Sequence, residues 1–355
     1  MTRYQVADAV VSGASVFWLR DTVRQAEACI VPEYGANATA FRTTPDDDPA
    51  PGEPVDLLVP PENPAQLRDN PFASGNPILF PFPNRVRQGI YTFEGRTYRM
   101  DRLMALGRDP AAGHAIHGLV ADKPWSVEAV QADADRAFLR CTLTLDAYPD
   151  IQEQYPFPCR LTATYTLCDG VLELQVEATN TGPTRLPMGF GIHPWFPVAL
   201  RPGRRLPDSL TDLAPGQRAR TMVRVPCTAL WELDQLMPTG RVLPAEGPFA
   251  LNDFRTLEDH FYDHVFTEVQ RNSDGWSEAS VRDPQTGMEA YLSADPAFRE
   301  WVFYAPLDRP VVALEPYTCP TDAVNLQARG IDAGLIALSP GGTWRGTVRF
   351  GLRRF

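Results

Sequence analysis

Long apolar runs, an excess of basic residues and paired cysteine motifs are all missing from this 355-residue chain. No stretch approaches the roughly 18 consecutive apolar residues that a membrane-spanning helix needs. Asp8 interrupts the apolar N-terminal segment, which argues against a secretory signal peptide. The net charge of −11 disfavours nucleic acid and anionic membranes as partners. These absences predict a cytoplasmic protein that binds neither nucleic acid nor a membrane.

The cysteines show no C-x-x-C pair and no zinc-like spacing. With 44% hydrophobic and 22% charged residues, a chain of this length can bury a sizeable core and has no need of disulfide staples. We therefore expect reduced and mostly buried thiols at all six positions, which are Cys29, Cys141, Cys159, Cys168, Cys227 and Cys319.

Several catalytic signatures are also missing. The sequence contains no G-x-S-x-G, P-loop, G-x-G-x-x-G or H-E-x-x-H motif. Serine hydrolysis, phosphoryl transfer and dinucleotide chemistry therefore lose their usual support.

Strand patterns dominate what is present. Residues 160–167 and 171–179 alternate apolar and polar side chains on either side of Asp169-Gly170, a strong two-residue hairpin turn. A second hairpin is expected from residues 90–93 and 96–100, turning at Glu94-Gly95. Further strands are predicted at residues 138–145, 311–314 and 343–352.

Helix patterns are short and few, because 35 prolines, about twice the average usage, interrupt most windows. The two candidates lie near residues 296–301 and 322–329. Many strands without αβ alternation predict an all-β fold, a large sandwich or barrel. We expect a single domain over residues 1–355, with the Pro- and Asp-rich residues 43–70 forming a surface insertion loop or lid.

The stretch MGFGIHPWFP places His193 after two spaced glycines and before Pro194-Trp195-Phe196. Burial and aromatic neighbours can tune the charge of such a histidine and suit it to act as a general acid. The pattern alone favours a packed core histidine. Trp195, Phe196 and Tyr317 could present apolar faces to a ligand or belong to the core.

Glu315 follows an apolar run and precedes Pro316, which predicts a position at a strand end. A partly desolvated carboxylate there would be a stronger base, although a solvated strand-end glutamate fits the same pattern. Asp263 lies in the aromatic stretch HFYDHVF.

Two further segments carry polar candidates. His114 and His117 in GHAIHG lack a third ligand at a familiar metal spacing, and their flanking glycines indicate a tight turn near a ligand or another backbone. Asn84-Arg85 follows the segment FPFP, where an arginine could offer a fork of donors to ligand oxygens or simply lie exposed.

Taken in order, these segments resemble the aldose 1-epimerase family, the galactose-mutarotase-like proteins. The resemblance rests on an ordered set of short motifs: VPEYGA (31–36), PILFPFPNR (77–85), the 91–98 hairpin, HAIHGLV (114–120) with Trp125, GFGIHPWF (189–196), YDHVF (262–266), ALEPYT (313–318), NL (325–326), RGID (329–332) and LSPGGT (338–343).

The resemblance implies a large antiparallel β-sandwich that holds a sugar in an open cleft and interconverts its α and β anomers. It implies that Glu315 is the general base for the anomeric hydroxyl and His193 the general acid for the ring oxygen. Arg85, His117 and Asp263, with Asn84, His114 and Trp195 nearby, would contact the sugar. Acid–base catalysis of this kind needs no metal and no cofactor. The partner would be a small sugar, and the protein a monomer or homodimer.

Two positions depart from the family pattern. His114 occupies a region where galactose-type members carry an asparagine, and Pro194-Trp195-Phe196-Pro197 replaces a tyrosine-phenylalanine-asparagine sequence. Both changes bear on which sugar is preferred rather than on the proposed acid and base.

Three alternatives stay open. The first is a sugar-binding protein without turnover, although such a protein would need neither His193 nor Glu315. The second is a mutarotase for a phosphorylated or sulfonated sugar, with Arg85, Arg87 and His114 as anion partners. The third is a glycosidase that uses Asp263 and Glu315 as its two carboxylates.

Overall fold

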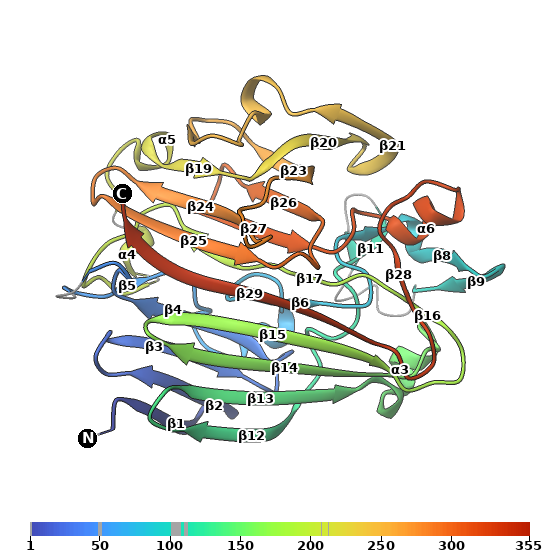
Figure 1. The fold of residues 1–355 in the computed structure, drawn as a ribbon, viewed down its shortest axis with the longest axis horizontal. Helices are drawn as coiled ribbons and strands as arrows, with labels where there is room; N and C mark the ends of the chain where they lie inside the picture. The colour runs from blue at the N-terminus through green and yellow to red at the C-terminus, as the bar shows by residue number, and fades with distance from the viewer. Residues whose placement is uncertain (1, 49–51, 101–107, 110–112, 207, 212) are drawn as a thin grey trace.

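The computed structural model describes residues 2–48, 52–100, 108–109, 113–206, 208–211 and 213–355. Strands dominate, and the ladders of the two largest sheets are antiparallel. Figure 1 shows long strands lying side by side across the molecule, with only short helices between them. The all-β sandwich prediction is therefore confirmed.

The largest sheet has nine strands and forms the front layer in Figure 1. In spatial order its strands are β12 (Ser126–Ala132), β13 (Ala137–Thr144), β14 (Cys159–Cys168), β15 (Val171–Asn180), β29 (Thr343–Arg354), β25 (Met288–Ala294), β24 (Ser277–Asp283), β19 (Met222–Arg224) and β22 (Arg255–Thr256).

The second large sheet has eight strands and carries the candidate site. Its order is β21 (Met237–Pro244), β20 (Cys227–Asp234), β23 (Tyr262–Val269), β26 (Glu300–Ala305), β27 (Val311–Tyr317), β17 (Gly191–Ile192) and β6 (Ile78–Leu79), with β18 (Trp195–Pro197) also pairing with β27.

A five-stranded sheet near the N-terminus and three small sheets complete the strands. They contain β1 (Tyr4–Val11), β2 (Ala14–Asp21), β3 (Ala26–Val31), β4 (Asn37–Thr43) and β5 (Val55–Asp56); β10 (Arg108–Asp109), β11 (His114–Ile116) and β7 (Arg85–Val86); β16 (Leu186–Met188) and β28 (Ile336–Leu338); and β8 (Ile90–Phe93) and β9 (Arg96–Arg99).

The helices are one or two turns long and lie in the connections. They are α1 (Gln66–Asp69), α3 (Pro149–Gln152), α4 (Asp208–Thr211), α5 (Gln217–Arg220) and α6 (Ala323–Ala328), with 3₁₀ turns η1 (Arg87–Gly89), η2 (Leu145–Ala147) and η3 (Gly247–Phe249).

The alternation of side chains along β26 and β27 separates the core from the site. Trp301 of β26 is fully buried, and its indole N–H donates to the Ser277 hydroxyl of β24, which ties the two large sheets together. The Phe196 and Phe350 rings meet across the same interface, 6.2 Å apart. Successive strand residues point to opposite faces. The intervening residues of β26 and β27, Glu315 among them, therefore face away from this core.

Most local predictions are confirmed. Cys159–Cys168 and Val171–Asn180 pair as a hairpin around Asp169-Gly170, and Ile90–Phe93 pairs with Arg96–Arg99. The strands predicted at 138–145, 311–314 and 343–352 appear as β13, β27 and β29, and the second predicted helix appears as α6. Five of the six cysteines are buried, and Cys168 is partly exposed.

The helix predicted near residues 296–301 is wrong. The Asp295 carboxylate accepts hydrogen bonds from the backbone N–H of Ala297 and Thr347, so it closes a turn instead of starting a helix. The chain then enters β26 at Glu300, because the following residues alternate with the period of a strand.

Residues 43–70 are only partly the predicted surface loop; of these, 49–51 lie outside the described residues. Val55–Asp56 adds a strand to the N-terminal sheet, and Leu57 and Leu58 join the main core. The backbone N–H of Val59 donates a hydrogen bond to the carbonyl of Trp195 at 2.9 Å. The apolar residues inside this Pro- and Asp-rich segment therefore anchor it beside the candidate site.

Candidate active site

A cavity of about 230 Å³ lies against the face of the eight-stranded sheet that points away from the core. Three separate sheet segments contribute to it, namely the β7–β11 pair, the β17–β18 connection and the strands β23, β26 and β27. The cavity is lined by Asn84, Arg85, Ile116, His117, His193, Phe261, Asp263, Val302, Tyr304 and Glu315.

His193 lies in the two-residue connection between β17 and β18 and faces Glu315 of the neighbouring strand β27. Gly191 pairs with Tyr317 and Trp195 pairs with Ala313, and equal numbers of residues separate these pairs on the two strands. His193 therefore lies opposite Glu315, and its Nε2 is 3.5 Å from the Oε1 of Glu315. Both side chains are buried.

Glu315 lies inside β27, so the prediction of a strand end is wrong. On one side Pro316 pairs with Trp301 of β26. On the other side the ladder is interrupted between the Gly191–Tyr317 and Trp195–Ala313 pairs, so Pro316 has no ladder partner there. A proline can continue a strand where its missing N–H meets an interrupted ladder, so the break in the partner strand accommodates Pro316 beside the site.

Burial shifts the pKa values of the facing pair in opposite directions. Desolvation raises the pKa of Glu315 well above its ordinary value; a hydrogen bond from Tyr317 and the charge of Arg85 act against this, and the charge of Asp263 adds to it. Desolvation also lowers the pKa of His193 to about 4, with a contribution from Arg309. The usual preference of a proton for imidazole over carboxylate is thereby reversed.

Packing orients the His193 ring. The Trp195 ring lies 4.9 Å from it and the His117 ring meets it edge-on at 5.2 Å. The Nδ1 atom of His193 is buried and has no hydrogen-bond partner among the described residues. The Trp195 indole is itself fixed, because its N–H donates to the Phe72 carbonyl at 2.7 Å and the Arg309 guanidinium lies over its ring.

Arg85 and Asp263 form an ion pair across the cavity, with Nη2 3.5 Å from Oδ2. Arg85 belongs to β7 and Asp263 to β23, so two sheets bring them together. The Asn84 side-chain oxygen accepts hydrogen bonds from the backbone N–H and the Nη1 of Arg85. The positively charged Arg85 and the negatively charged Asp263 therefore line the same cavity, together with the Asn84 amide.

His117 lies at a tight turn after β11, with a positive φ of 64°. Burial lowers its pKa well below the ordinary value, and the charges of His193 and Arg85 lower it further. At Gly118 an added Cβ would lie 2.1 Å from the Phe80 carbonyl oxygen. The predicted close backbone approach at this glycine is confirmed, and it holds His117 in the wall of the cavity.

Several residues named from the sequence lie outside the cavity lining. The Nδ1 of His114 accepts a hydrogen bond from the backbone N–H of Gln88 at 3.0 Å. The Trp195 ring packs against the His193 ring, and Phe196 is part of the main core. Arg87 forms an ion pair with Asp322, 3.7 Å between Nε and Oδ2, away from the cavity.

Two aromatic residues of the site region, Phe261 and Tyr304, were not named from the sequence, and Tyr317 was named only as a possible apolar face or core residue. Phe261 and Tyr304 line the cavity, and the hydroxyl of Tyr317 donates to Glu315. Two patterns could have indicated them: Phe261 and Tyr317 each lie two residues from a candidate acid, hence on the same face of a strand. Tyr304 has no such local signal, because only the pairing of β23 with β26 places it opposite Asp263.

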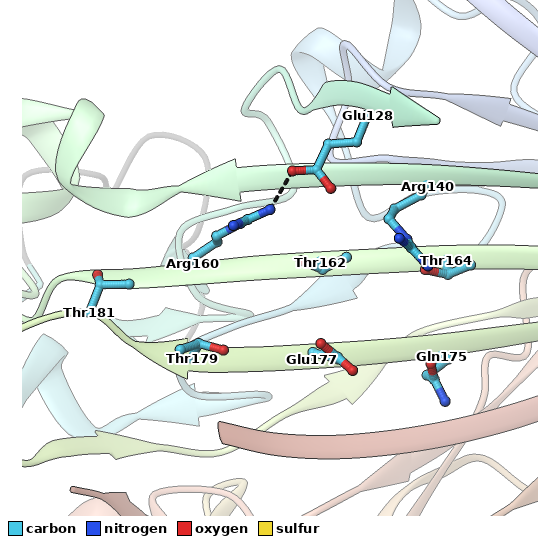
Figure 2. A pocket seen from close by; sticks show the side chains of 9 residues that line it. All are labelled: Glu128, Arg140, Arg160, Thr162, Thr164, Gln175, Glu177, Thr179 and Thr181. Atoms are coloured by element: carbon cyan, nitrogen blue, oxygen red, sulfur yellow. Dashed lines mark hydrogen bonds and ion pairs between the residues drawn. The ribbon is translucent and has the colours of Figure 1, made fainter. Parts of the chain in front are cut away.

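A second and larger hollow, of about 440 Å³, lies on the outer face of the nine-stranded sheet. Figure 2 shows its side chains standing on neighbouring strands as threonines and charged residues, with Arg160 paired to Glu128. It contains no histidine and no buried acid. Unlike this hollow, the 230 Å³ cavity brings buried histidines together with a buried acid.

Two structural features of the described residues bear on metals and membranes. No group of three or more histidine, cysteine or acidic side chains there is placed to hold a metal ion. Within the same residues, no helix is both long enough and apolar enough to cross a membrane.

Known proteins resemble the chain over almost its full length. The curated Escherichia coli protein YihR, described as uncharacterized, is 25% identical over 280 residues, which cover 79% of each chain. A galactose mutarotase-like protein from Clostridium acetobutylicum superimposes with a TM-score of 0.84 at 18% identity, covering 99% of both chains. Galactose 1-epimerase from Lactobacillus acidophilus gives a TM-score of 0.71 at 15% identity, covering 100% of this chain and 99% of the other.

These structural likenesses show a shared fold. The family assignment comes from the sequence, because the family model for aldose 1-epimerase matches residues 22–351. The match includes both facing residues of the cavity and all of its other lining residues. The chain belongs to the aldose 1-epimerase family.

Proposed function

We propose that the protein is an aldose mutarotase that interconverts the α and β anomers of an aldohexose, with Glu315 as general base and His193 as general acid. The observation that supports this most directly is the facing pair in the cavity, 3.5 Å apart between Nε2 and Oε1. The anomeric oxygen and the ring oxygen of a sugar are bonded to the same carbon. A base and an acid that face each other at this distance can therefore reach the two oxygens at once.

In the proposed reaction Glu315 takes the proton from the anomeric hydroxyl while His193 gives a proton to the ring oxygen. The bond between C1 and the ring oxygen breaks, and an open-chain aldehyde forms. After rotation about C1–C2, the hydroxyl that was the ring oxygen attacks the other face of the carbonyl. His193 takes back its proton and Glu315 returns its own, so the pair ends as it began.

The shifted pKa values determine where the shared proton lies. Each group holds this proton for half of the reaction, so the proton passes between the two groups during the cycle. Burial raises the pKa of Glu315 and lowers the pKa of His193 to about 4. A single shared proton therefore lies on Glu315 in the free pair, and it moves to His193 in the arrangement that reacts with the sugar. The pair contributes about 10²–10⁴ in rate for each group.

The remaining polar side chains would bind sugar hydroxyls. Arg85 offers donors, Asp263 offers acceptors, and His117 and Asn84 border the same space. Because Arg85 already faces Asp263 at 3.5 Å, its charge is largely balanced within the cavity. This favours an uncharged aldohexose over a phosphorylated or sulfonated sugar. The name of the Lactobacillus acidophilus relative, galactose 1-epimerase, is consistent with that choice.

The test is anomer exchange followed by proton NMR on freshly dissolved α-D-glucose and α-D-galactose, with their 6-phosphates as the charged arm. Wild type, Glu315→Gln and His193→Asn are compared in dilute buffer. We expect wild type to accelerate exchange of a neutral sugar and both variants to lose at least about 100-fold. Faster turnover of the phosphates would overturn the neutral-sugar proposal.

A rate equal to buffer on every sugar would overturn the mutarotase proposal itself. Binding of the same sugars in calorimetry would then identify a sugar-binding protein without turnover. Retention of full activity in Glu315→Gln would instead remove the assigned base and leave the reaction in place.

A further inference from the structure

A second buried residue of the same strand, Tyr317, forms a hydrogen bond with the Glu315 carboxylate. The hydroxyl of Tyr317 donates a hydrogen bond to Oε2 of Glu315, while Oε1 faces His193. Tyr317 is fully buried and does not line the cavity. The two carboxylate oxygens therefore have different surroundings, one inside the protein and one toward the sugar space.

The strand pairing makes room for this tyrosine. Tyr317 lies two residues after Glu315, so both side chains point to the same face of β27. Directly opposite Tyr317 is Gly191. A Cβ built at Gly191 would lie 2.4 Å and 2.6 Å from the Cδ1 and Cε1 atoms of the Tyr317 ring. Only a glycine at this position lets the ring lie where its hydroxyl reaches Glu315.

Other charged and titratable groups also act on the pair. Asp263 of β23 and Arg85 of β7 influence both Glu315 and Tyr317 from across the cavity. From β26, Glu300 lies opposite Tyr317 in the ladder, with its carboxyl oxygen bound to the Trp231 indole N–H. Burial and the neighbouring Glu315 raise the pKa of Tyr317 well above its ordinary value, so the phenol stays protonated as a donor.

We propose that Tyr317 is a positioning residue for the general base: its hydroxyl fixes Oε2 of Glu315, so that Oε1 alone is directed at His193 and the anomeric hydroxyl. The inference rests on the proposed mutarotase function. It adds a residue that touches neither the sugar nor its reacting atoms, and it gives a reason for the glycine at position 191.

The hydrogen bond has a direct effect on proton affinity. A donor to a carboxylate stabilises the charged form and lowers its pKa. Without the Tyr317 hydroxyl, the pKa of Glu315 rises further and the carboxylate is less populated when the sugar binds. The carboxylate also gains freedom to rotate, so Oε1 spends less time in the reactive orientation.

The experiment compares wild type with Tyr317→Phe, which removes the hydroxyl and keeps the ring. We expect kcat/KM at neutral pH to fall about 10-fold, and the limb of the pH profile that reports Glu315 to move about one unit to higher pH. The matched control is Tyr165→Phe, because Tyr165 is also fully buried and its hydroxyl donates to the Ala36 carbonyl at 2.8 Å. The control loses a comparable buried hydrogen bond and keeps the wild-type pH profile.

A direct titration separates this inference from the proposed function. The ¹³C signal of the Glu315 carboxyl, assigned by its loss in Glu315→Gln, gives a midpoint without any substrate. In Tyr317→Phe we expect that midpoint to move upward. Replacing Tyr317 with 3-fluorotyrosine makes the phenol a stronger donor in a nearly unchanged shape, and the midpoint then moves downward.

An unchanged midpoint in both Tyr317 proteins, with a uniform loss of activity or none, would show that Tyr317 only packs. Should Tyr317→Phe fail to fold, the fluorotyrosine protein alone decides the question. If wild type has no mutarotase activity but the midpoints shift as expected, the proposed function is wrong. Tyr317 would then still control the pKa of Glu315, but it would have no role in mutarotation.

Discussion

His193 and Glu315 face each other across the break between β17 and β18, with Nε2 3.5 Å from Oε1. His193 has no ladder partner of its own, but the flanking pairs Gly191–Tyr317 and Trp195–Ala313 hold its short connection against β27. The separation of the two groups is therefore set by the sheet itself rather than by a mobile loop. A site built on strands keeps its geometry more closely than one built on loops, which suits a reaction that passes protons to and fro between fixed partners.

The first prediction concerns pH. The active pair carries one proton in total, so activity is lost when the pair gains a second proton or loses its only one. Because burial lowers the pKa of His193 to about 4, the acid limb of kcat/KM is expected near that value. The alkaline limb then reports Glu315, whose pKa is raised well above its ordinary value. The two limbs belong to the coupled pair.

The measurement is enzymatic anomer exchange from pH 3.5 to pH 9 after subtraction of the spontaneous rate. In Glu315→Gln the limb that reports Glu315 is expected to disappear, and the residual activity should fall as pH rises through the pKa of His193, because His193 acts as an acid only when protonated. An acid limb near the ordinary histidine pKa would contradict the assigned order of protonation, because it would mean that His193 is not desolvated in the free enzyme.

The second prediction tests the glycine opposite Tyr317. In Gly191→Ala the new methyl group meets the Tyr317 ring, with 2.4 Å to Cδ1. We expect a loss of about 1–3 kcal/mol in the free energy of unfolding from overpacking, and a fall in kcat/KM beyond it as Glu315 loses its anchor. Gly52→Ala is the control, because a Cβ there meets nothing within 4 Å. Urea unfolding and NMR exchange measure both effects, and unchanged kcat/KM in folded Gly191→Ala would contradict the prediction.

Hairpins and long alternating strands were predictable because their signals are local. The Asp169-Gly170 turn and its flanking alternation determine the register of β14 and β15 over their whole length. The error at residues 296–301 has an equally local cause, since an Asp295 turn and a helix start share the same residue type. The buried part of residues 43–70 was missed because composition outweighed the short apolar run at residues 55–59.

The site was predictable only in part. Short motifs named Arg85, His117, Asp263, His193 and Glu315, and the structure places all of them around one cavity. No local pattern could place Asp263 beside Arg85, because their contact joins residues 178 positions apart. For the same reason the sequence did not distinguish His114, bound to the Gln88 backbone, from His117 in the cavity wall. Their roles in catalysis, a single domain and the oligomeric state stay predictions.

The third prediction concerns the rim of the cavity. Phe261 lines the cavity with half of its surface exposed, 50%, and its ring meets the Tyr304 ring edge-on at 6.0 Å. An apolar ring that packs on a sugar contributes equally to ground state and transition state. Phe261→Ala is therefore expected to raise KM about five-fold, for roughly 1 kcal/mol of lost contact, with kcat and the pH limbs unchanged.

Phe355→Ala serves as the comparison for that variant, because Phe355 has the same exposed fraction, 50%, at the end of the chain and does not line the cavity. Initial exchange rates over a range of sugar concentrations separate KM from kcat. A fall in kcat for Phe261→Ala would mean that the ring orients the sugar in the reacting state instead of merely binding it.

The fourth prediction concerns stability and Glu300, a buried acid outside the proposed chemistry. Burial raises the pKa of Glu300 to about 8, although Thr267 and the Trp231 indole N–H donate to it. The unfolded chain has the ordinary value of 4.5. Below that value the carboxyl is neutral in both states and costs nothing. As pH rises toward 8 the unfolded state loses its proton first, so this group lowers the free energy of unfolding by about 1.4 kcal/mol per pH unit.

Glu300→Gln keeps an acceptor for the Trp231 indole and removes this dependence on pH. Urea unfolding at pH 5, 6, 7 and 8 should therefore show the free energy of unfolding of the variant increasing relative to that of wild type at each step. Above pH 8 the difference should stay constant. Glu246→Gln, at an exposed glutamate, should follow wild type throughout. If the free energies of unfolding of wild type and Glu300→Gln changed in parallel with pH, Glu300 would be charged in the native protein. Its surroundings would then have to stabilise that charge as well as water does.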